Sequence, residues 1–407
     1  MRTVEEALEA ILGRVKRLPV ARVALLDSLG RVLAEDVAAD IAVPPFDNSA
    51  VDGYAVRAAD ITGARPESPV RLRTLPEVPA GALATKPVLP GTAARIMTGA
   101  PVPPGADAIV MVEDTRSAGE SIEILQAAQP GQHVRYAGED VTPGSVVLRA
   151  GTLIHAAEIA MLATMGRATV PTFRPARVAV LSTGDEVVDI EEGVAPPPGK
   201  IRNSNGYALA ALVREAGAEV RTRLHISDDL DATEAALRQC VEAGADAIVS
   251  AGGVSVGDRD FIKPALERLG RLELWRVAMK PGKPLAFGSI GEILFFGLPG
   301  NPVSALVTFE LFVRPALGKM AGRQEEDLKR PVVQAVVTEP VAHVPGRREF
   351  VRAVTTAEGG RFLTRPTGAQ VSGILHSMLG ANSLLVIPED SSGLTPGQTA
   401  AVLLLHG

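Results

Sequence analysis

The chain alternates short apolar runs with longer segments in which apolar residues recur at helical spacing. Apolar runs at residues 177–181, 245–250 and 293–296 each lead into a loop rich in glycine and polar residues. Such runs are typical of buried parallel strands. Further strands are predicted at residues 219–226 and 272–278, and helices at 206–216, 232–243, 260–269 and 302–317. Strands that alternate with helices predict an α/β domain with a parallel sheet and right-handed crossovers.

The pattern changes on both sides of this region. Residues 3–17 and 156–165 have helical spacing, and the proline- and glycine-rich stretch between them carries short strand patterns such as 108–112 and 145–148. After a charged linker, strand patterns recur to the end of the chain. We therefore predict four parts: a helical and linker domain at 1–45 with 147–172, an inserted β-rich lobe at 46–146, an α/β domain at 173–325 and an all-β domain at 326–407.

Composition and charge narrow the classes of function. The chain has 407 residues, enough for several domains, and its net charge of -6 argues against a general nucleic-acid partner. A single cysteine, Cys240, excludes intrachain disulfides and thiolate metal clusters, and its place in a helical pattern predicts a buried residue. No apolar run approaches the length of a membrane span, and the first residues do not resemble a signal peptide. We expect a cytoplasmic protein without a membrane contact.

Three polar loops follow the predicted strands. They include Ser182, Thr183 and Gly184 after the first strand and the glycine-rich segment 251–260 after the third. Backbone N–H groups at the carboxyl ends of strands converge on negative charge, so these loops predict a phosphate-binding edge. Neither the P-loop spacing nor the dinucleotide fingerprint is present. Ser255 lacks the surroundings of a nucleophile, so a phosphate contact is the preferred role for it.

Acidic and basic side chains accumulate at the same edge. Glu186, Asp228, Asp258 and Asp260 follow predicted strands or begin helices, and carboxylates of this kind suit Mg²⁺ bound together with substrate phosphates. Helix capping is the alternative for Asp258 and Asp260. Lys280 and Lys283 stand out because arginine is the usual cation of this chain. They suit an oxyanion, although two exposed lysines around a Pro-Gly turn are an alternative.

The β-rich lobe has polar loops of its own. Residues 44–56, 95–101 and 135–141 each combine acidic or hydroxyl side chains with glycine, which fits polar recognition on a loop. Ordinary turns rich in aspartate and asparagine are the alternative interpretation.

Seven ordered motifs resemble one family, the molybdopterin molybdenumtransferases, which include the gephyrin E domain. The motifs are residues 46–56, 95–100, 138–140, 182–186, 250–257, 280–284 and 297–304. The resemblance implies four domains in an elongated homodimer with sites between subunits. It also implies that molybdenum from molybdate enters adenylyl-molybdopterin and that AMP leaves in the presence of Mg²⁺. Contacts with the molybdopterin adenylyltransferase and with molybdoenzyme maturation proteins are expected.

The resemblance also implies roles for individual residues. Catalytic roles fall on Asp52, Thr98, Asp140, Glu186, Asp228, Asp260 and Lys280. Substrate binding falls on Ser182, Thr183, Gly184, Gly252, Gly253, Ser255, Gly257, Arg276, Lys283, Pro299 and Ser372. Metal binding falls on Glu186, Asp228 and Asp260. Electrostatic positioning is expected to lower most of the barrier, without a covalent nucleophile.

Two alternatives remain at this point. The adenylyltransferase that activates molybdopterin shares the glycine-rich loop, but it is a compact domain without an inserted lobe or a β-tail. A dimeric pterin-binding scaffold without turnover is the second alternative, because the gephyrin E domain also anchors receptors. Turnover by the purified protein separates the scaffold from the enzyme.

Overall fold

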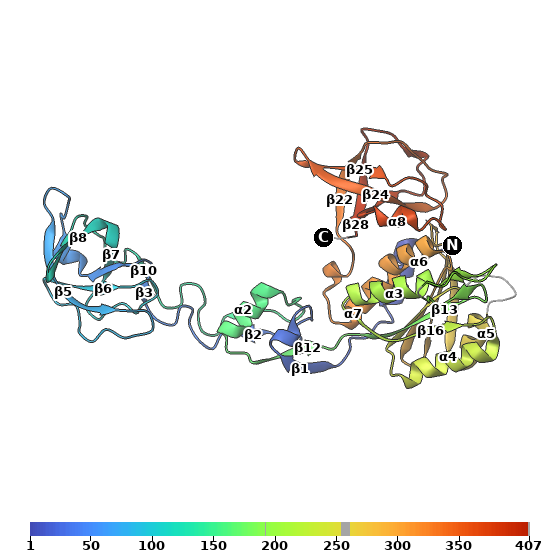
Figure 1. Ribbon diagram of the computed structural model, residues 1–407, viewed down its shortest axis with the longest axis horizontal. Helices are drawn as coiled ribbons and strands as arrows, with labels where there is room; N and C mark the ends of the chain where they lie inside the picture. The colour runs from blue at the N-terminus through green and yellow to red at the C-terminus, as the bar shows by residue number, and fades with distance from the viewer. Residues whose placement is uncertain (192, 254–260, 406–407) are drawn as a thin grey trace. The chain divides into compact units, whose positions relative to one another are not determined.

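The computed structural model describes residues 1–191, 193–253 and 261–405. The chain forms two compact units, which are drawn in Figure 1. One unit contains Met1–Glu35, Ala150–Ile159 and Ala168–Gly407, and the other contains Asp36–Arg149 and Ala160–Arg167. The second unit therefore interrupts the sequence of the first.

The first unit is built around a six-stranded sheet with the order β16-β13-β17-β21-β20-β18. The strands are β13 (Arg177–Thr183), β16 (Glu219–Ile226), β17 (Ala247–Ala251), β18 (Arg271–Arg276), β20 (Pro284–Ile290) and β21 (Ile293–Leu298). Strands β16, β13, β17 and β21 run parallel, as the sequence predicts. Strands β18 and β20 instead pair antiparallel, and β20 was not predicted. The reason is the short connection 277–283, which cannot hold the crossover that a parallel pair requires.

Helices cover both faces of this sheet (Figure 1). Along β13, Val178 and Val180 belong to one hydrophobic core, while Ala179 and Leu181 belong to another. The first core includes α1 (Val4–Leu12), α3 (Ser204–Glu215), α6 (Pro302–Thr308), the π-helical turn η4 (Phe309–Val313) and α7 (Arg314–Met320). The second includes α4 (Leu230–Glu242) and α5 (Ile262–Leu269). Cys240 is fully buried in α4, as predicted, and burial raises the pKa of its thiol to about 12.

The end of the chain forms a closed β-barrel, which confirms the predicted all-β fold of this region. Its strands are β22 (Val332–Val337), β24 (Arg348–Glu358), β25 (Arg361–Pro366), β26 (Ser383–Ile387) and β28 (Thr399–Leu404). Closure follows because β24 pairs with both β25 and β26. The two-residue strand β19 (Met279–Lys280) adds to the barrel by parallel pairing with β24. A loop of the α/β domain is thus joined to the barrel by backbone hydrogen bonds. Shorter elements of this unit are β23 (Val341–Ala342), β27 (Gly393–Leu394), α8 (His376–Leu379) and η5 (Glu325–Asp327).

The N-terminal part of the first unit begins with α1, where Thr3 and Glu6 form a capping box. Strand β1 (Val20–Ala24) then pairs antiparallel with β12 (Thr169–Phe173), which lies on the far side of the insertion in sequence. The 3-10 turn η1 (Leu26–Ser28) follows β1. Helix α2 (Ala156–Thr164) begins in this unit. None of the described helices has the length and apolar character needed to cross a membrane.

The second unit is a β-rich fold with a six-stranded sheet of order β7-β4-β6-β5-β9-β8. Its strands are β4 (Gly53–Val56), β5 (Val70–Val78), β6 (Thr92–Ile96), β7 (Ala108–Met111), β8 (Thr115–Ala118) and β9 (Ser121–Ile124). Neighbouring residues on β4, Tyr54 and Ala55, belong to two different hydrophobic cores, so both sheet faces are covered. Short pairings join β3 (Asn48–Ser49) to β10 (Val134–Arg135) and β2 (Val37–Ala38) to β11 (Val146–Leu148). The 3-10 turns are η2 (Ala58–Ile61) and η3 (Val112–Asp114).

Candidate functional site

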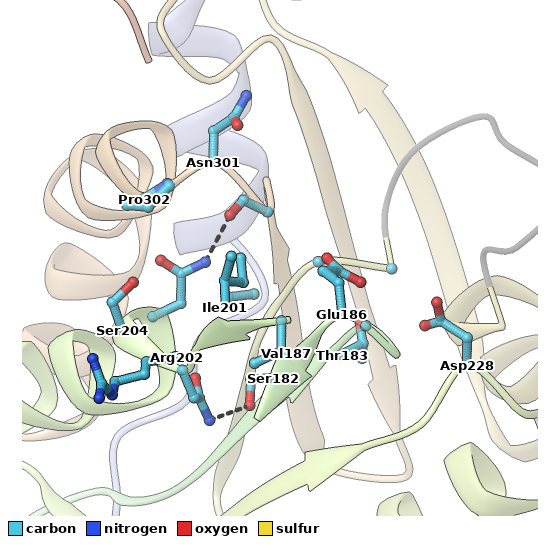
Figure 2. Close-up of a pocket in the computed structure, with 17 residues that line it drawn as sticks. Ser182, Thr183, Glu186, Val187, Ile201, Arg202, Ser204, Asp228, Asn301 and Pro302 are labelled. Carbon is cyan, nitrogen blue, oxygen red and sulfur yellow. Dashed lines mark hydrogen bonds between the residues drawn. The ribbon is translucent and has the colours of Figure 1, made fainter. Parts of the chain in front are cut away.

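A cavity of about 520 Å³ lies at the carboxyl edge of the parallel strands (Figure 2). Loops after β13, β16, β17 and β21 line it together with the first residues of α3. Predicted site residues in its wall are Ser182, Thr183, Gly184, Glu186, Asp228, Gly252 and Gly253. The structure therefore brings seven predicted residues, from the ends of β13, β16 and β17, into one cavity.

Two glycines allow the backbone to line this cavity closely. Gly252 and Gly253 have φ values of 90° and 70°, a region that other residues rarely adopt. A Cβ atom on Gly252 would lie 2.7 Å from the hydroxyl oxygen of Thr183, and one on Gly253 would lie 2.4 Å from a side-chain carbon of Ile262. Both positions therefore require glycine, because of the dihedral angle and because of the space.

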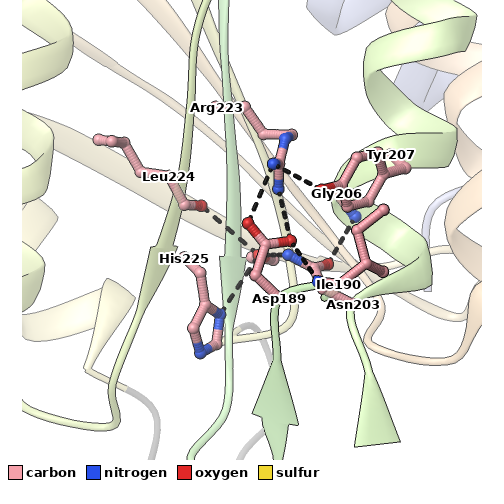
Figure 3. A network of polar contacts seen from close by, with 9 residues as sticks. Asp189, Ile190, Asn203, Gly206, Tyr207, Arg223, Leu224 and His225 are labelled. Atoms are coloured by element: carbon pink, nitrogen blue, oxygen red, sulfur yellow. Dashed lines mark hydrogen bonds and ion pairs between the residues drawn. The ribbon is translucent and has the colours of Figure 1, made fainter. Parts of the chain in front are cut away.

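The hydroxyl of Ser182 takes part in the capping of α3. Asn203 accepts a hydrogen bond from the Gly206 amide at 2.9 Å, and its Nδ2 donates to Ser182 Oγ at 2.8 Å. Ser182 Oγ also lies 3.4 Å from Nδ1 of His225 (Figure 3). Ser182 is only 2% exposed, so its side chain chiefly fixes the start of α3 against β13.

A second network holds the segment after the short strand β14 (Val187–Val188), which pairs with β15 (Ile201–Arg202). The guanidinium of Arg223 on β16 donates to both carboxylate oxygens of Asp189, at 3.2 and 3.0 Å (Figure 3). It also stacks on the ring of Tyr207 on α3, 4.0 Å from the centroid. The hydrogen bonds from Arg223 lower the pKa of Asp189. This network attaches one wall of the cavity to both α3 and β16.

Asparagines that sequence reasoning missed complete the wall. Asn205 donates from Nδ2 to the carbonyl of Gly300 at 2.7 Å, which ties α3 to the loop after β21. Asn203, Asn205 and Asn301 all line the cavity. Asn301 stands at the N-cap position of α6, but its side chain makes no capping hydrogen bond. Its Nδ2 donates to Ser372 Oγ at 3.2 Å instead, so Ser372 meets this loop from the barrel.

The polar run 202–205 was the available signal for Asn203 and Asn205. It precedes a helical pattern at the same sheet edge, and asparagine is a favoured N-cap residue. The helix was predicted to begin at residue 206, whereas α3 begins at Ser204.

Two carboxylates at the cavity, those of Glu186 and Asp228, have the chemistry of a Mg²⁺ site. Both lie on the same side of it in Figure 2. Their loops are linked, because the Asp228 amide donates to Oδ1 of Asp185 at 3.0 Å. Within the described ranges, no group of three or more histidine, cysteine, aspartate or glutamate side chains could hold a metal ion. One or two carboxylates plus substrate phosphates are, however, the usual ligands of Mg²⁺. The predicted residues Ser255, Gly257, Asp258 and Asp260 lie outside the described residues.

The predicted cations lie at the last residue of β18, Arg276, and on the segment that connects β18 to β20. Strand β18 is antiparallel to β20, and β20 is antiparallel to β21, so this segment returns to the same sheet edge as the cavity. Lys280 Nζ lies 2.8 Å from Oε1 of Glu349, while Arg276 and Lys283 are exposed. Among the described residues of the cavity wall, these three cations and the buried Pro299 are not found. The charge of Lys280 is compensated by Glu349, which sequence reasoning did not foresee.

In the second unit, Asp52 and Thr98 form a close pair. Oδ1 of Asp52 accepts hydrogen bonds from the hydroxyl and from the amide of Thr98, both at 2.7 Å. The hydroxyl contact, the amide contact and the charge of Arg95 lower the pKa of Asp52. Asp140 lines a hollow of about 390 Å³ together with Phe46, Arg135 and Gly99, which follows Thr98 in the chain. The three predicted residues of this unit thus belong to neighbouring loops.

Comparisons with known proteins cover nearly the whole chain. Family models match residues 2–166 as the MoeA N-terminal region (domain I and II), residues 179–319 as a probable molybdopterin binding domain and residues 334–405 as the MoeA C-terminal region (domain IV). The chain is 41% identical to molybdopterin molybdenumtransferase 2 of Mycobacterium tuberculosis over 397 residues, 96% of each chain. It is 38% identical to molybdopterin molybdenumtransferase of Bacillus subtilis, covering 99% of this chain and 94% of that one.

A solved structure agrees with these matches. The molybdopterin biosynthesis moeA protein from Pyrococcus horikoshii OT3 superposes with a TM-score of 0.85 at 34% identity, covering 99% of this chain and 100% of that chain. The cavity at the carboxyl edge lies within the segment that matches the molybdopterin binding domain.

Proposed function

The chain belongs to the family of the molybdopterin molybdenumtransferases, and we propose that it inserts molybdenum from molybdate into adenylyl-molybdopterin with release of AMP. One observation carries the proposal. The segment matched as a molybdopterin binding domain contains a cavity of about 520 Å³ that combines glycine loops, hydroxyl groups and two carboxylates. A volume of this size is within the range of small-molecule sites. The match over nearly the full length favours this activity over a compact adenylyltransferase.

In this proposal the glycine loops bind the phosphate part of the substrate. The N–H group of Gly253 and the hydroxyl of Thr183 lie at strand carboxyl ends, where backbone dipoles favour an anion. The N–H group of Gly252 instead donates to the carbonyl of Leu298 at 3.0 Å, which attaches the loop after β17 to β21. The cap formed by Asn203 holds the start of α3 against β13, and the Gly252 amide holds the loop after β17 against β21, so these donors keep their positions without the substrate. Donors that are fixed in advance do not have to reorganise during the reaction.

Glu186 and Asp228 would hold Mg²⁺, with Asp260 as a third candidate ligand. The bound cation would neutralise part of the negative charge that substrate phosphates, molybdate and departing AMP bring together. Lys280, Arg276 and Lys283 would bind the molybdate dianion at the same sheet edge. The chain's own residues would therefore position the substrates and neutralise their negative charge, while the dithiolene sulfurs of the substrate would bind the molybdenum atom.

Asp52, Thr98 and Asp140 would act on the site of a partner subunit in a homodimer. The support for this part is chemical, since three polar side chains on neighbouring loops of the second unit suit contact with a polar substrate. A cytoplasmic location, and contacts with the molybdopterin adenylyltransferase and with molybdoenzyme maturation proteins, belong to the same proposal.

Mass detection of AMP tests the activity directly. Purified protein with adenylyl-molybdopterin, molybdate and Mg²⁺ should release AMP, and the release should depend on molybdate. Asp228→Asn should lower the rate by about 100-fold or more, because an amide is a poor ligand for Mg²⁺. Asp231→Asn is the matched control, since Asp231 is an exposed acid in the first turn of α4.

Two outcomes would count against the proposal. No AMP release by the folded wild-type protein would favour the scaffold. An Asp228→Asn variant as active as the Asp231→Asn control at every Mg²⁺ concentration would remove Asp228 from the metal site.

A further inference from the structure

The barrel domain contributes a buried carboxylate to the segment that carries Lys280. The side chain of Glu349, on β24, is 4% exposed, and both of its oxygens have close partners. Oε1 lies 2.8 Å from Nζ of Lys280, and Oε2 lies 2.7 Å from Nδ1 of His343. His343 is itself buried, with a side chain that is 1% exposed. A chain of contacts therefore runs from the barrel interior to Lys280.

The backbone sets this arrangement before the side chains meet. Strand β19 pairs in parallel with β24 so that Lys280 is opposite Glu349 and Met279 is opposite Arg348. The Arg348 amide donates to the carbonyl of Ala278 at 2.9 Å. Lys280 is thus held at a fixed register on the barrel, although it belongs to a loop of the α/β domain.

The other charged groups near Glu349 have partners of their own. Arg348 pairs with Glu5 and with Glu389. Arg352 is fully buried and bonds to Ser377 Oγ at 3.1 Å, with Glu349 acting on it only through its charge. A buried carboxylate is costly unless a cation accompanies it, and Lys280 is the cation in direct contact. The pair has no net charge, so Lys280 cannot attract an anion as an isolated charge does.

Lys280 retains the capacity to donate. Its ammonium group has three N–H donors, it forms an ion pair with Glu349 on one side, and the side chain is 44% exposed. A free lysine side chain moves among many rotamers, and the contact with Glu349 removes much of this freedom. The remaining donors then point from a fixed position at the sheet edge.

We propose that Glu349 and His343 are positioning residues that orient the ammonium group of Lys280 toward a tetrahedral dianionic oxyanion. His343 fixes the rotamer of Glu349, and Glu349 fixes Lys280. The identification of the oxyanion as molybdate rests on the proposed function. The positioning itself rests on the contacts of the three residues, so the two can fail separately.

Two substitutions of Glu349 separate the effect of its side-chain length from the effect of its charge. Glu349→Asp keeps the charge but withdraws the carboxylate by one methylene, whereas Glu349→Gln keeps the reach and an acceptor oxygen. With positioning as the role, Glu349→Asp should raise the half-saturating concentration of molybdate about tenfold, the loss expected for one hydrogen bond to a charged group. Glu349→Gln should raise it by less. Both should leave half-saturation by adenylyl-molybdopterin unchanged.

A conservative substitution of His343 tests its contact with Glu349. Nδ2 of asparagine can take the place of Nδ1 of histidine, so His343→Asn should keep the contact with Glu349 and the wild-type response to molybdate. His343→Leu should behave as Glu349→Asp does. A role in stability alone predicts lower melting temperatures for these variants without any change in half-saturation by molybdate, and that result would overturn the proposal.

A labelling experiment measures how firmly the amine of Lys280 is held, without any turnover of substrate. Acetic anhydride labels lysines according to how freely their amines move and deprotonate, and peptide mass spectrometry measures each site. Labelling of Lys280 should rise severalfold in Glu349→Asp, while Lys263, which is 52% exposed beside Glu267, should label as before. Unchanged labelling of Lys280 would overturn the proposal. If labelling rises but Lys280→Met keeps the wild-type response to molybdate, Glu349 does position Lys280 and the molybdate role proposed for Lys280 is wrong.

Discussion

Side chains from separate loops meet in the cavity because the parallel strands before them end at one edge of the sheet. Ser182, Glu186 and Gly252 needed only the strand pattern and the rule that parallel carboxyl ends meet. Asn205 and Glu349 could not be found in this way. Asn205 contacts Gly300, 95 positions away, and Glu349 reaches Lys280 through a strand pairing that no local pattern specifies. The carboxylate of Glu349 also changes the interpretation of Lys280, from an isolated charge to a donor held in place.

The pair of Asp52 and Thr98 gives a prediction at the scale of single residues. Thr98→Val removes the hydroxyl donor and keeps the amide donor, so the lowered pKa of Asp52 should rise toward its ordinary value of 3.8. A lowered folded pKa stabilises the folded protein above the unfolded pKa, and the effect is lost as the pH falls through the folded value. Activity near neutral pH should therefore not change through titration of Asp52.

NMR titration of the Asp52 carboxyl carbon between about pH 2 and 6 measures this change, because that window brackets an ordinary aspartate pKa. Thr62→Val is the control, since the Thr62 hydroxyl in the same unit bonds only to backbone carbonyls. An Asp52 midpoint that is equal in wild type, Thr98→Val and Thr62→Val would show that the hydroxyl contact is absent in solution.

At the scale of elements, the sequence predicted the parallel strands and missed β20. The Lys280-Pro281-Gly282-Lys283-Pro284 motif has the composition of a loop, and Pro284 begins the strand itself. The helix predicted at residues 302–317 is interrupted by the π-helical turn η4, which contains the buried Glu310. Burial raises the pKa of Glu310, but hydrogen bonds from Arg314 and Arg330 outweigh it and lower the pKa. Arg330 lies 20 positions away, so the partner that makes this buried carboxylate tolerable was not visible locally.

The loop after β17 gives a prediction at this scale. Gly252→Ala places a Cβ atom 2.7 Å from the Thr183 hydroxyl oxygen at a φ of 90°, so both the loop and the cavity wall must shift. We expect a loss of stability of about 1–3 kcal/mol and at least a tenfold rise in half-saturation by adenylyl-molybdopterin. Gly244→Ala is the matched control, because Gly244 has a φ of 71° and nothing within 4 Å.

Urea denaturation and AMP release measure the two effects. Gly244→Ala should share the strain of the dihedral angle and keep the wild-type half-saturation. If both variants bind the substrate equally well, the loop after β17 does not form part of the binding site.

At the scale of the whole molecule, the chain places its polar loops in two compact units. The cavity with Glu186 and Asp228 belongs to one unit, and Asp52, Thr98 and Asp140 belong to the other. The alternation of composition along the chain predicted a β-rich stretch between segments of helical pattern. The proposed action of the second unit of one subunit on the cavity of another cannot be read from any pattern in a single chain, because it depends on the assembly of subunits.

Mixed dimers decide whether the residues of one site come from two subunits or from a single subunit. If each site combines the cavity of one subunit with Asp52 of the other, a subunit with Asp52→Ala paired with a subunit with Asp228→Asn leaves one site intact and places both defects in the second. Each variant alone should be inactive, whereas the heterodimer should recover up to about half of the wild-type activity, as two-fold symmetry requires. If both residues served a site within one subunit, every site would carry one defect and activity would stay lost.

Co-expressed subunits with different tags, purified through both tags and assayed for AMP release, give the measurement. Well-folded heterodimers without activity would reject a site shared between subunits, and a purified protein that is monomeric at working concentration would reject it before any assay.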